Sequence, residues 1–166
     1  MHREVKDWLR LLWDTHPALF HGRRVLECGS RMVPGGGTVS GFFADCEYTG
    51  LDAIAGQGVD VVGLAHEYQP DHPFDVVVSC QMLEHDPNWR ESVAHMVEMV
   101  APGGALLLTF PDDGWPMHGD DYTPIPGYYH NPDKDEIAAM IAPAFDQIEC
   151  TTERLTVLIL ATGKSE

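Results

Sequence analysis

The sequence predicts an α/β fold, in which an open, mostly parallel sheet carries helices on both faces and ends in an antiparallel hairpin. Continuously apolar segments of strand length alternate with helical periodicity, which is typical of parallel strands buried on both faces. The last two strand-like segments, 145–150 and 155–161, are only four residues apart, whereas a parallel crossover needs about a dozen or more. At 166 residues, a single domain is expected.

A helix is expected first, within residues 1–21, because apolar side chains recur at helical spacing before Pro17 ends the pattern. We expect its Trp8 and Trp13 to pack in the core; a lid over a ligand or a contact in a homodimer are the alternatives. The strand-like segments that follow are 24–28, 48–52, 59–62, 74–79 and 105–110. Helical spacing returns between Trp89 and Val100, where Pro102-Gly103-Gly104 is expected to stop the helix.

The C-terminal part, residues 132–166, is expected to hold one more helix before the hairpin. That helix fits residues 132–142, with Asn131 as its N-cap and Pro132 at its first position.

Charge and cysteine content exclude several classes of function. The chain has 10 Lys and Arg against 26 Asp and Glu, a net charge of −16, so it lacks the basic face that duplex nucleic acid or an anionic membrane requires. Its four cysteines form no CxxC pair, and no apolar stretch reaches the ~20 residues of a membrane span. The N-terminus does not resemble a signal peptide. A reduced, cytoplasmic protein is therefore expected.

The residues that end the first two strands point to a nucleoside ligand. Ligands of open parallel sheets bind beyond the carboxyl ends of the strands. The first strand runs into Gly29, and the second ends in Asp52, 23 positions later, where an acid can accept hydrogen bonds from ribose hydroxyls. A turn glycine and a solvated aspartate are the alternative. Arg31 and Pro34 break the GxGxxG fingerprint, which disfavours a nicotinamide-dependent oxidoreductase.

A set of motifs in a fixed order carries a family resemblance. It comprises Val25-Leu26-Glu27-Cys28-Gly29-Ser30-Arg31, Tyr48-Thr49-Gly50-Leu51-Asp52, Gly58-Val59-Asp60-Val61-Val62, Phe74-Asp75-Val76-Val77-Val78-Ser79, Met82-Leu83-Glu84-His85 and Val100-Ala101-Pro102-Gly103-Gly104. Over residues 24–111 the chain resembles the small class I S-adenosylmethionine-dependent methyltransferases. The resemblance implies a Rossmann-like fold and methyl transfer from S-adenosylmethionine to a small-molecule acceptor by in-line displacement.

The resemblance also implies roles for individual residues around the cofactor. Residues near its methionine part would be Glu27, Gly29 and Ser30. Asp52 would hold the ribose hydroxyls, and the adenine would be flanked by Ala53, Leu64 and Ala65. Cys80 and Gln81 would line the cofactor from its other side. Arg31 replaces a glycine of the family motif, and Leu64 replaces a frequent aspartate. These departures leave a catalytically degenerate cofactor-binding or scaffold protein as the alternative.

The long segment 112–131 is the candidate for acceptor recognition, because some twenty residues without regular pattern are usually functional. Its acids, aromatics and histidines are Asp112, Asp113, Trp115, His118, Asp120, Asp121, Tyr122, Tyr128, Tyr129 and His130. A solvated loop covering the sheet edge is the alternative. His118 and His85 are candidate general bases, although His85 also suits packing at a helix start. The spacing of His118, Asp120, Asp121 and His130 fits no standard zinc pattern, so no metal site is expected.

Overall fold

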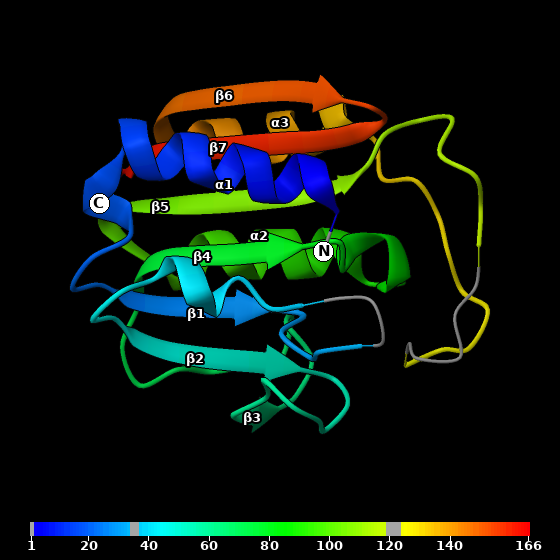
Figure 1. Cartoon of the computed structure of the whole chain (residues 1–166), viewed down its shortest axis with the longest axis horizontal. Coiled ribbons are helices and arrows are strands. Elements are labelled where there is room, and N and C mark those ends of the chain that lie inside the picture. Colours follow the sequence, from blue (N-terminus) through cyan, green and yellow to red (C-terminus); the bar gives the residue numbers. More distant parts are fainter. Residues whose placement is uncertain (1, 34–36, 119–123) are drawn as a thin grey trace.

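The computed structural model describes residues 2–33, 37–118 and 124–166. In these residues a seven-stranded sheet runs in the order β3-β2-β1-β4-β5-β7-β6 (Figure 1). The strands are β1 (Arg24–Cys28), β2 (Glu47–Asp52), β3 (Val61–Val62), β4 (Phe74–Cys80), β5 (Val100–Pro111), β6 (Phe145–Glu153) and β7 (Thr156–Lys164). Neighbours from β3 to β5 pair in parallel, and β7 pairs antiparallel with both β5 and β6. The predicted fold class is confirmed.

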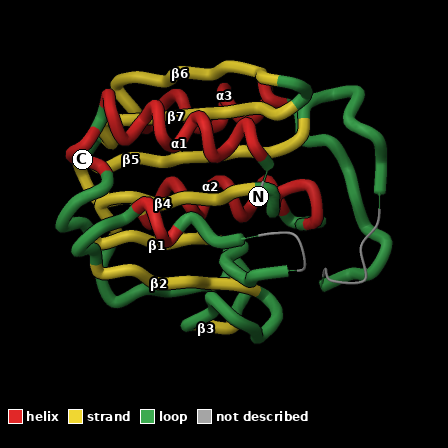
Figure 2. The backbone as a smooth tube through the Cα atoms, in the orientation of Figure 1, coloured by secondary structure: helices red, strands yellow, loops and turns green. Residues whose placement is uncertain are grey.

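Helices cover both faces of this sheet, as its continuously apolar strands require. α1 (Arg3–Thr15) lies on one face, and α2 (Trp89–Met99) and α3 (Lys134–Ile141) lie on the other (Figure 2). Short 3-10 turns are formed by Pro17–Leu19, Ser40–Phe42, Leu83–His85 and Ala142–Ala144. None of the helices in the described ranges is long and apolar enough to serve as a membrane span.

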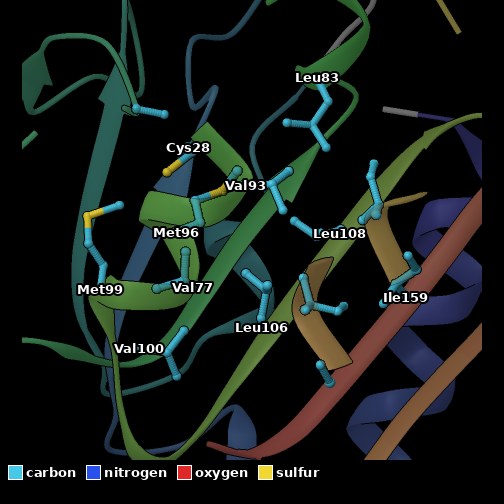
Figure 3. Packing of buried hydrophobic residues seen from close by; sticks show 14 of the residues in the cluster. Cys28, Val77, Leu83, Val93, Met96, Met99, Val100, Leu106, Leu108 and Ile159 are labelled. Carbon is cyan, nitrogen blue, oxygen red and sulfur yellow. The ribbon is translucent and has the colours of Figure 1, made fainter. Parts of the chain in front are cut away.

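Side chains alternate between two cores, one on each face of the sheet. On the α2 and α3 side, Val77 and Leu106 pack with Val93 and Met96 of α2 (Figure 3). On the α1 side, buried residues of α1 pack against the other side chains of the same strands, among them Val76, Val78 and Leu107. Trp8 and Trp13 are half-buried against this second core, which confirms their expected packing.

Several element boundaries differ from the sequence prediction; β3 forms only at Val61–Val62 of the predicted 59–62, and at β5 and α3 hydrogen bonds override local signals. β5 begins at Val100 and includes the Pro-Gly-Gly segment, because Val100 already pairs with Phe74 of β4 before a register shift. α3 begins at Lys134, and its N-cap is Asp133, whose Oδ1 accepts from the Asp135 and Glu136 amides at 2.8 and 3.2 Å. Asn131 instead donates its side-chain amide to the Trp115 carbonyl at 3.1 Å.

The C-terminal hairpin is tighter than the sequence prediction of four connecting residues. β6 and β7 pair as far as Glu153 and Thr156, so the turn consists of Arg154 and Leu155. Both turn residues have positive φ, 46° and 64°, the backbone of the two-residue turn that matches strand twist. Because neither residue is glycine or asparagine, the sequence carries no signal of this turn.

Candidate functional site

A pocket opens at the carboxyl ends of β1, β2 and β3, the position expected for a ligand of this architecture. Its empty volume, part of which is open solvent, is about 300 Å³. The residues that line it are Cys28, Gly29, Leu51, Asp52, Ala53, Gly63, Leu64, Ala65, Met82 and Asp86. The structure thus brings together Gly29, Asp52, Ala53, Leu64 and Ala65 of the predicted cofactor residues.

The first wall of the pocket is the turn after β1, where a side chain has no room. Gly29 has φ +86°, in the left-handed region, and a Cβ at this position would lie 2.6 Å from the Cβ of Met82. The Gly29 and Ser30 amides both donate to the Leu51 carbonyl, at 2.8 and 3.1 Å. The turn is therefore fixed against the end of β2 with its backbone exposed to the pocket. Ser30 itself is 1% exposed and does not line the pocket.

Asp52, the last residue of β2, lines the pocket, and backbone donors hold its carboxylate. Its Oδ1 accepts from the Ile54 amide at 2.9 Å, and its Oδ2 accepts from the Arg31 amide at 3.0 Å. The side chain is only 15% exposed. A carboxylate offers roughly four lone-pair sites, and the hydrogen bonds given by the described residues occupy one on each oxygen. Two vicinal hydroxyls are a matching ligand group.

The opposite wall is apolar and is formed by the segment after β3. Gly63 donates its amide to the Asp52 carbonyl at 2.9 Å, which anchors this segment to the end of β2. Leu64 is 36% exposed, and Ala65 is buried behind it. Together with Ala53, these residues offer a flat aromatic ring van der Waals contact and backbone polar groups, but no side-chain hydrogen bond.

Glu27, Cys80 and Gln81 do not line this pocket. Glu27 is 2% exposed, and its carboxylate accepts from the Thr38 hydroxyl, the Tyr48 hydroxyl and the Val39 amide. Burial raises the pKa of Glu27 although these donors act in the opposite direction. Burial likewise raises the pKa of the Cys80 thiol to about 12. Gln81 Nε2 donates to the Thr109 hydroxyl at 3.3 Å.

A second group of side chains lies beyond the carboxyl ends of β4 and β5. The centroid of the His118 ring lies 4.3 Å from that of Tyr129 and 5.8 Å from that of His85. The His85 and Tyr129 ring centroids are 5.4 Å apart. We call His85, His118 and Tyr129 the ring cluster. The ring of His2, before α1, contacts Trp115 at 5.2 Å. Both predicted base candidates therefore lie in one place.

Glu84 adds a buried carboxyl group beside the ring cluster, which sequence reasoning did not select. It is 3% exposed, and its Oε2 has no hydrogen-bond partner among the described residues. Burial raises its pKa to about 8. Tyr129 is 6% exposed with a hydroxyl that also has no described partner, and burial followed by the Glu84 charge raises its pKa. The sequence analysis includes Glu84 only as part of the Met82-Leu83-Glu84-His85 motif, which carries no signal that this carboxyl is buried.

The segment 112–131 is partly structural and partly directed at the ring cluster. Asp112 accepts from Lys134 Nζ at 2.9 Å, which ties the end of β5 to α3. His130 stacks on Trp89 of α2 at 5.8 Å, and its amide donates to the Glu84 carbonyl at 3.0 Å. Asp113 is exposed, and Tyr128 is half-buried against His130. Asp120, Asp121 and Tyr122 lie outside the described residues.

A family model described as a methyltransferase domain matches residues 1–143. The chain belongs to this family. The resemblance to the methyltransferases is thereby confirmed at the level of the family. Ubiquinone biosynthesis O-methyltransferases of Aromatoleum aromaticum and Azoarcus sp. are 33% and 35% identical over 115 and 120 residues, in each case 61% of this chain. The chain spans about half the length of these curated relatives, 49% of each.

Solved methyltransferases share the fold at low sequence identity. The N-methyltransferase NodS of Bradyrhizobium japonicum superposes with a TM-score of 0.67 at 17% identity, covering 99% of this chain and 96% of NodS. The 1,6-didemethyltoxoflavin-N1-methyltransferase of Burkholderia thailandensis, solved with S-adenosylhomocysteine, gives a TM-score of 0.66 at 17% identity over 95% of this chain and 78% of that one. The arrangement of strands is therefore that of methyltransferases with different acceptors.

Proposed function

We propose that this chain transfers a methyl group from S-adenosylmethionine to a hydroxyl oxygen of a small acceptor bound at the ring cluster. The observation that carries the proposal is the path of one segment, residues 82–86. Met82 and Asp86 line the pocket, while Glu84 and His85 between them lie with Tyr129 and His118. One short turn thus places the cofactor pocket and the ring cluster next to each other, as a transfer between two bound molecules requires.

The pocket residues fit the cofactor on chemical grounds. Gly29 leaves its backbone open to a ligand, Asp52 has an acceptor position for each ribose hydroxyl, and Ala53, Leu64 and Ala65 would contact the adenine. When bound, S-adenosylmethionine supplies an electrophilic methyl group on a sulfonium centre. The negative charge of the chain favours capture of that cation. Four residues to which the resemblance gives a cofactor role do not line the pocket: Glu27, Ser30, Cys80 and Gln81. They would act on the cofactor only through the residues that do line it.

His118 would accept the proton of the acceptor hydroxyl through Nε2. Its Nδ1 lies 3.1 Å from the Pro116 carbonyl oxygen, which can only accept, so Nδ1 carries the hydrogen in the neutral ring. Nε2 then keeps its lone pair and can act as a general base. The curated relatives are named O-methyltransferases, which supports an oxygen nucleophile. A hydroxyl must lose its proton during transfer, so a base has a role here.

Calorimetric titration with S-adenosylhomocysteine tests the cofactor site. The unaltered chain should bind it, and Asp52→Ala should weaken binding about 10- to 100-fold, because the loss of hydrogen bonds to a charged group costs about 1.5–3 kcal/mol. Asp71→Ala removes an exposed acid as the matched control and should bind like the unaltered chain. A folded chain that binds neither S-adenosylhomocysteine nor S-adenosylmethionine would contradict the proposal.

Methyl transfer itself is tested with a panel of phenols, catechols, amines and thiols, read by the mass of the product. We expect methylation of a hydroxylated acceptor and a fall in its rate in His118→Gln, with S-adenosylhomocysteine affinity unchanged. Cofactor binding without transfer to any class of acceptor would instead favour the catalytically degenerate scaffold.

A further inference from the structure

Arg31 departs from the glycine motif, yet its side chain does not enter the pocket. It is 16% exposed and packs against Gly56, where a Cβ would lie 2.8 Å from both Cγ and Cδ of Arg31. Gly58 in the same segment has φ +87° and also leaves no space for a Cβ, since one would lie 2.7 Å from the Ser30 carbonyl oxygen. The absence of a side chain at Gly56 in the facing loop thus leaves the space that the Arg31 side chain occupies.

The buried position of Arg31 brings it against the carboxylate of Asp52. The Arg31 amide donates to Oδ2 at 3.0 Å, and the guanidinium Nε lies 3.7 Å from Oδ1. Both side chains are about 85% buried, so solvent screens this pair less than a surface ion pair. Asp52 lines the pocket, whereas Arg31 is not among the lining residues, so the arginine contacts the carboxylate without forming part of the pocket wall.

We propose that Arg31 is a positioning residue that fixes the Asp52 carboxylate for the ribose hydroxyls of the cofactor. The inference rests on the proposed function, since it assigns the pocket to S-adenosylmethionine. A free aspartate must lose rotational freedom when it binds two hydroxyls, and that loss reduces affinity. The Ile54 and Arg31 backbone amides hold one oxygen each, and the Arg31 guanidinium adds an ion pair 3.7 Å from Oδ1, so Asp52 is ordered before the ligand arrives. Arg31, which stands where the family motif has a glycine, therefore supports the cofactor site without entering the pocket.

The mechanism predicts that Arg31 acts only through Asp52, which a double-mutant cycle measures. We choose Arg31→Met, because methionine keeps an unbranched apolar stem against Gly56 and removes the guanidinium. Its affinity for S-adenosylhomocysteine, by calorimetry, should fall about 3- to 30-fold, within the range of coupling between contacting residues. In the Asp52→Ala background the same substitution should change affinity less than about 2-fold. Arg31→Lys, which keeps a cation, should recover part of the loss.

Equal losses from Arg31→Met in both backgrounds would overturn the inference, because Arg31 would then act independently of Asp52. Unchanged affinity in Arg31→Met would overturn it as well, and so would unchanged affinity in Asp52→Ala. No binding by the unaltered chain would instead overturn the proposed function.

A second measurement on Arg31→Lys covers the case in which Arg31→Met does not fold. Adenosine and 2′,3′-dideoxyadenosine are each titrated as competitors of S-adenosylhomocysteine. Arg31→Lys should lower the affinity for adenosine and leave the affinity for the dideoxynucleoside, which lacks both ribose hydroxyls, unchanged. Equal weakening of both nucleosides would overturn the inference.

Discussion

Replacing Glu84 with glutamine is expected to remove a large loss of stability that the unaltered protein undergoes as pH rises from about 5 to about 8. Burial raises the pKa of Glu84 from its ordinary 4.5 to about 8, so the folded protein keeps a proton that the unfolded chain releases. The contribution of protonated Glu84 to the free energy of unfolding is therefore complete below pH 4.5, and it is lost as pH rises towards 8. At about 1.4 kcal/mol per unit of pKa, the upper bound on this loss in the free energy of unfolding is about 5 kcal/mol.

The assay is urea unfolding of both proteins at about pH 5, 6, 7 and 8, with extrapolation to zero denaturant. The difference between the proteins isolates Glu84, because His2 and His130, whose pKa values are lowered chiefly by burial, titrate in both. The free energy of unfolding of Glu84→Gln should exceed that of the unaltered chain by an amount that grows with pH.

The matched control is Glu149→Gln, an exposed glutamate on edge strand β6, for which the difference from the unaltered chain should stay constant with pH. A constant difference for Glu84→Gln as well would refute the reasoning. It would mean that the Glu84 carboxyl is solvated in solution, or that it ionises with a partner that compensates its burial.

Three further substitutions test the turn, the core and the helix cap. Gly29→Ala should lower S-adenosylhomocysteine affinity at least ~10-fold, because an alanine there is strained by its positive φ and collides with Met82, whereas Gly41→Ala has open space and should bind normally. Leu107→Ala should reduce the free energy of unfolding by about 2–5 kcal/mol in urea titrations. Asp133→Ala should reduce it by about 1 kcal/mol, and Asp133→Asn, which keeps a capping oxygen, by clearly less.

The central strands could be predicted from the sequence because burial on both faces leaves a continuous apolar run. β1 matches the predicted 24–28, and β4 extends the predicted 74–79 by one residue. The start of β5 could not be predicted, since Pro102-Gly103-Gly104 is a local stop signal that pairing with β4 overrides. The N-cap of α3 was misassigned for a related reason: Asn131 and Asp133 are equally good caps locally, and only the contact of Asn131 with Trp115 distinguishes them.

The lining of the pocket could be predicted from the sequence where strand ends dictate it, and not where a turn does. Gly29 and Asp52 follow strands whose carboxyl ends must meet at one edge of the sheet. Met82 and Asp86 reach the same pocket through the Leu83–His85 turn, whose direction depends on tertiary contacts. The direction of the Arg31 side chain, away from the pocket, is likewise set by the facing Gly56.

The two-residue strand β3 makes its edge of the sheet less stable locally than the central strands. Residues 53–60 and 63–73, all of them described by the structure, form no helix, and Val61 and Val62 pair only with the end of β2. Amides at this edge should therefore exchange with deuterium through local opening, whereas the amides of β4 and β5 should exchange only through global unfolding. Because Leu64 and Ala65 stand at this edge, a bound nucleoside should slow the same local exchange. Hydrogen exchange would then report ligand occupancy even when no acceptor is known.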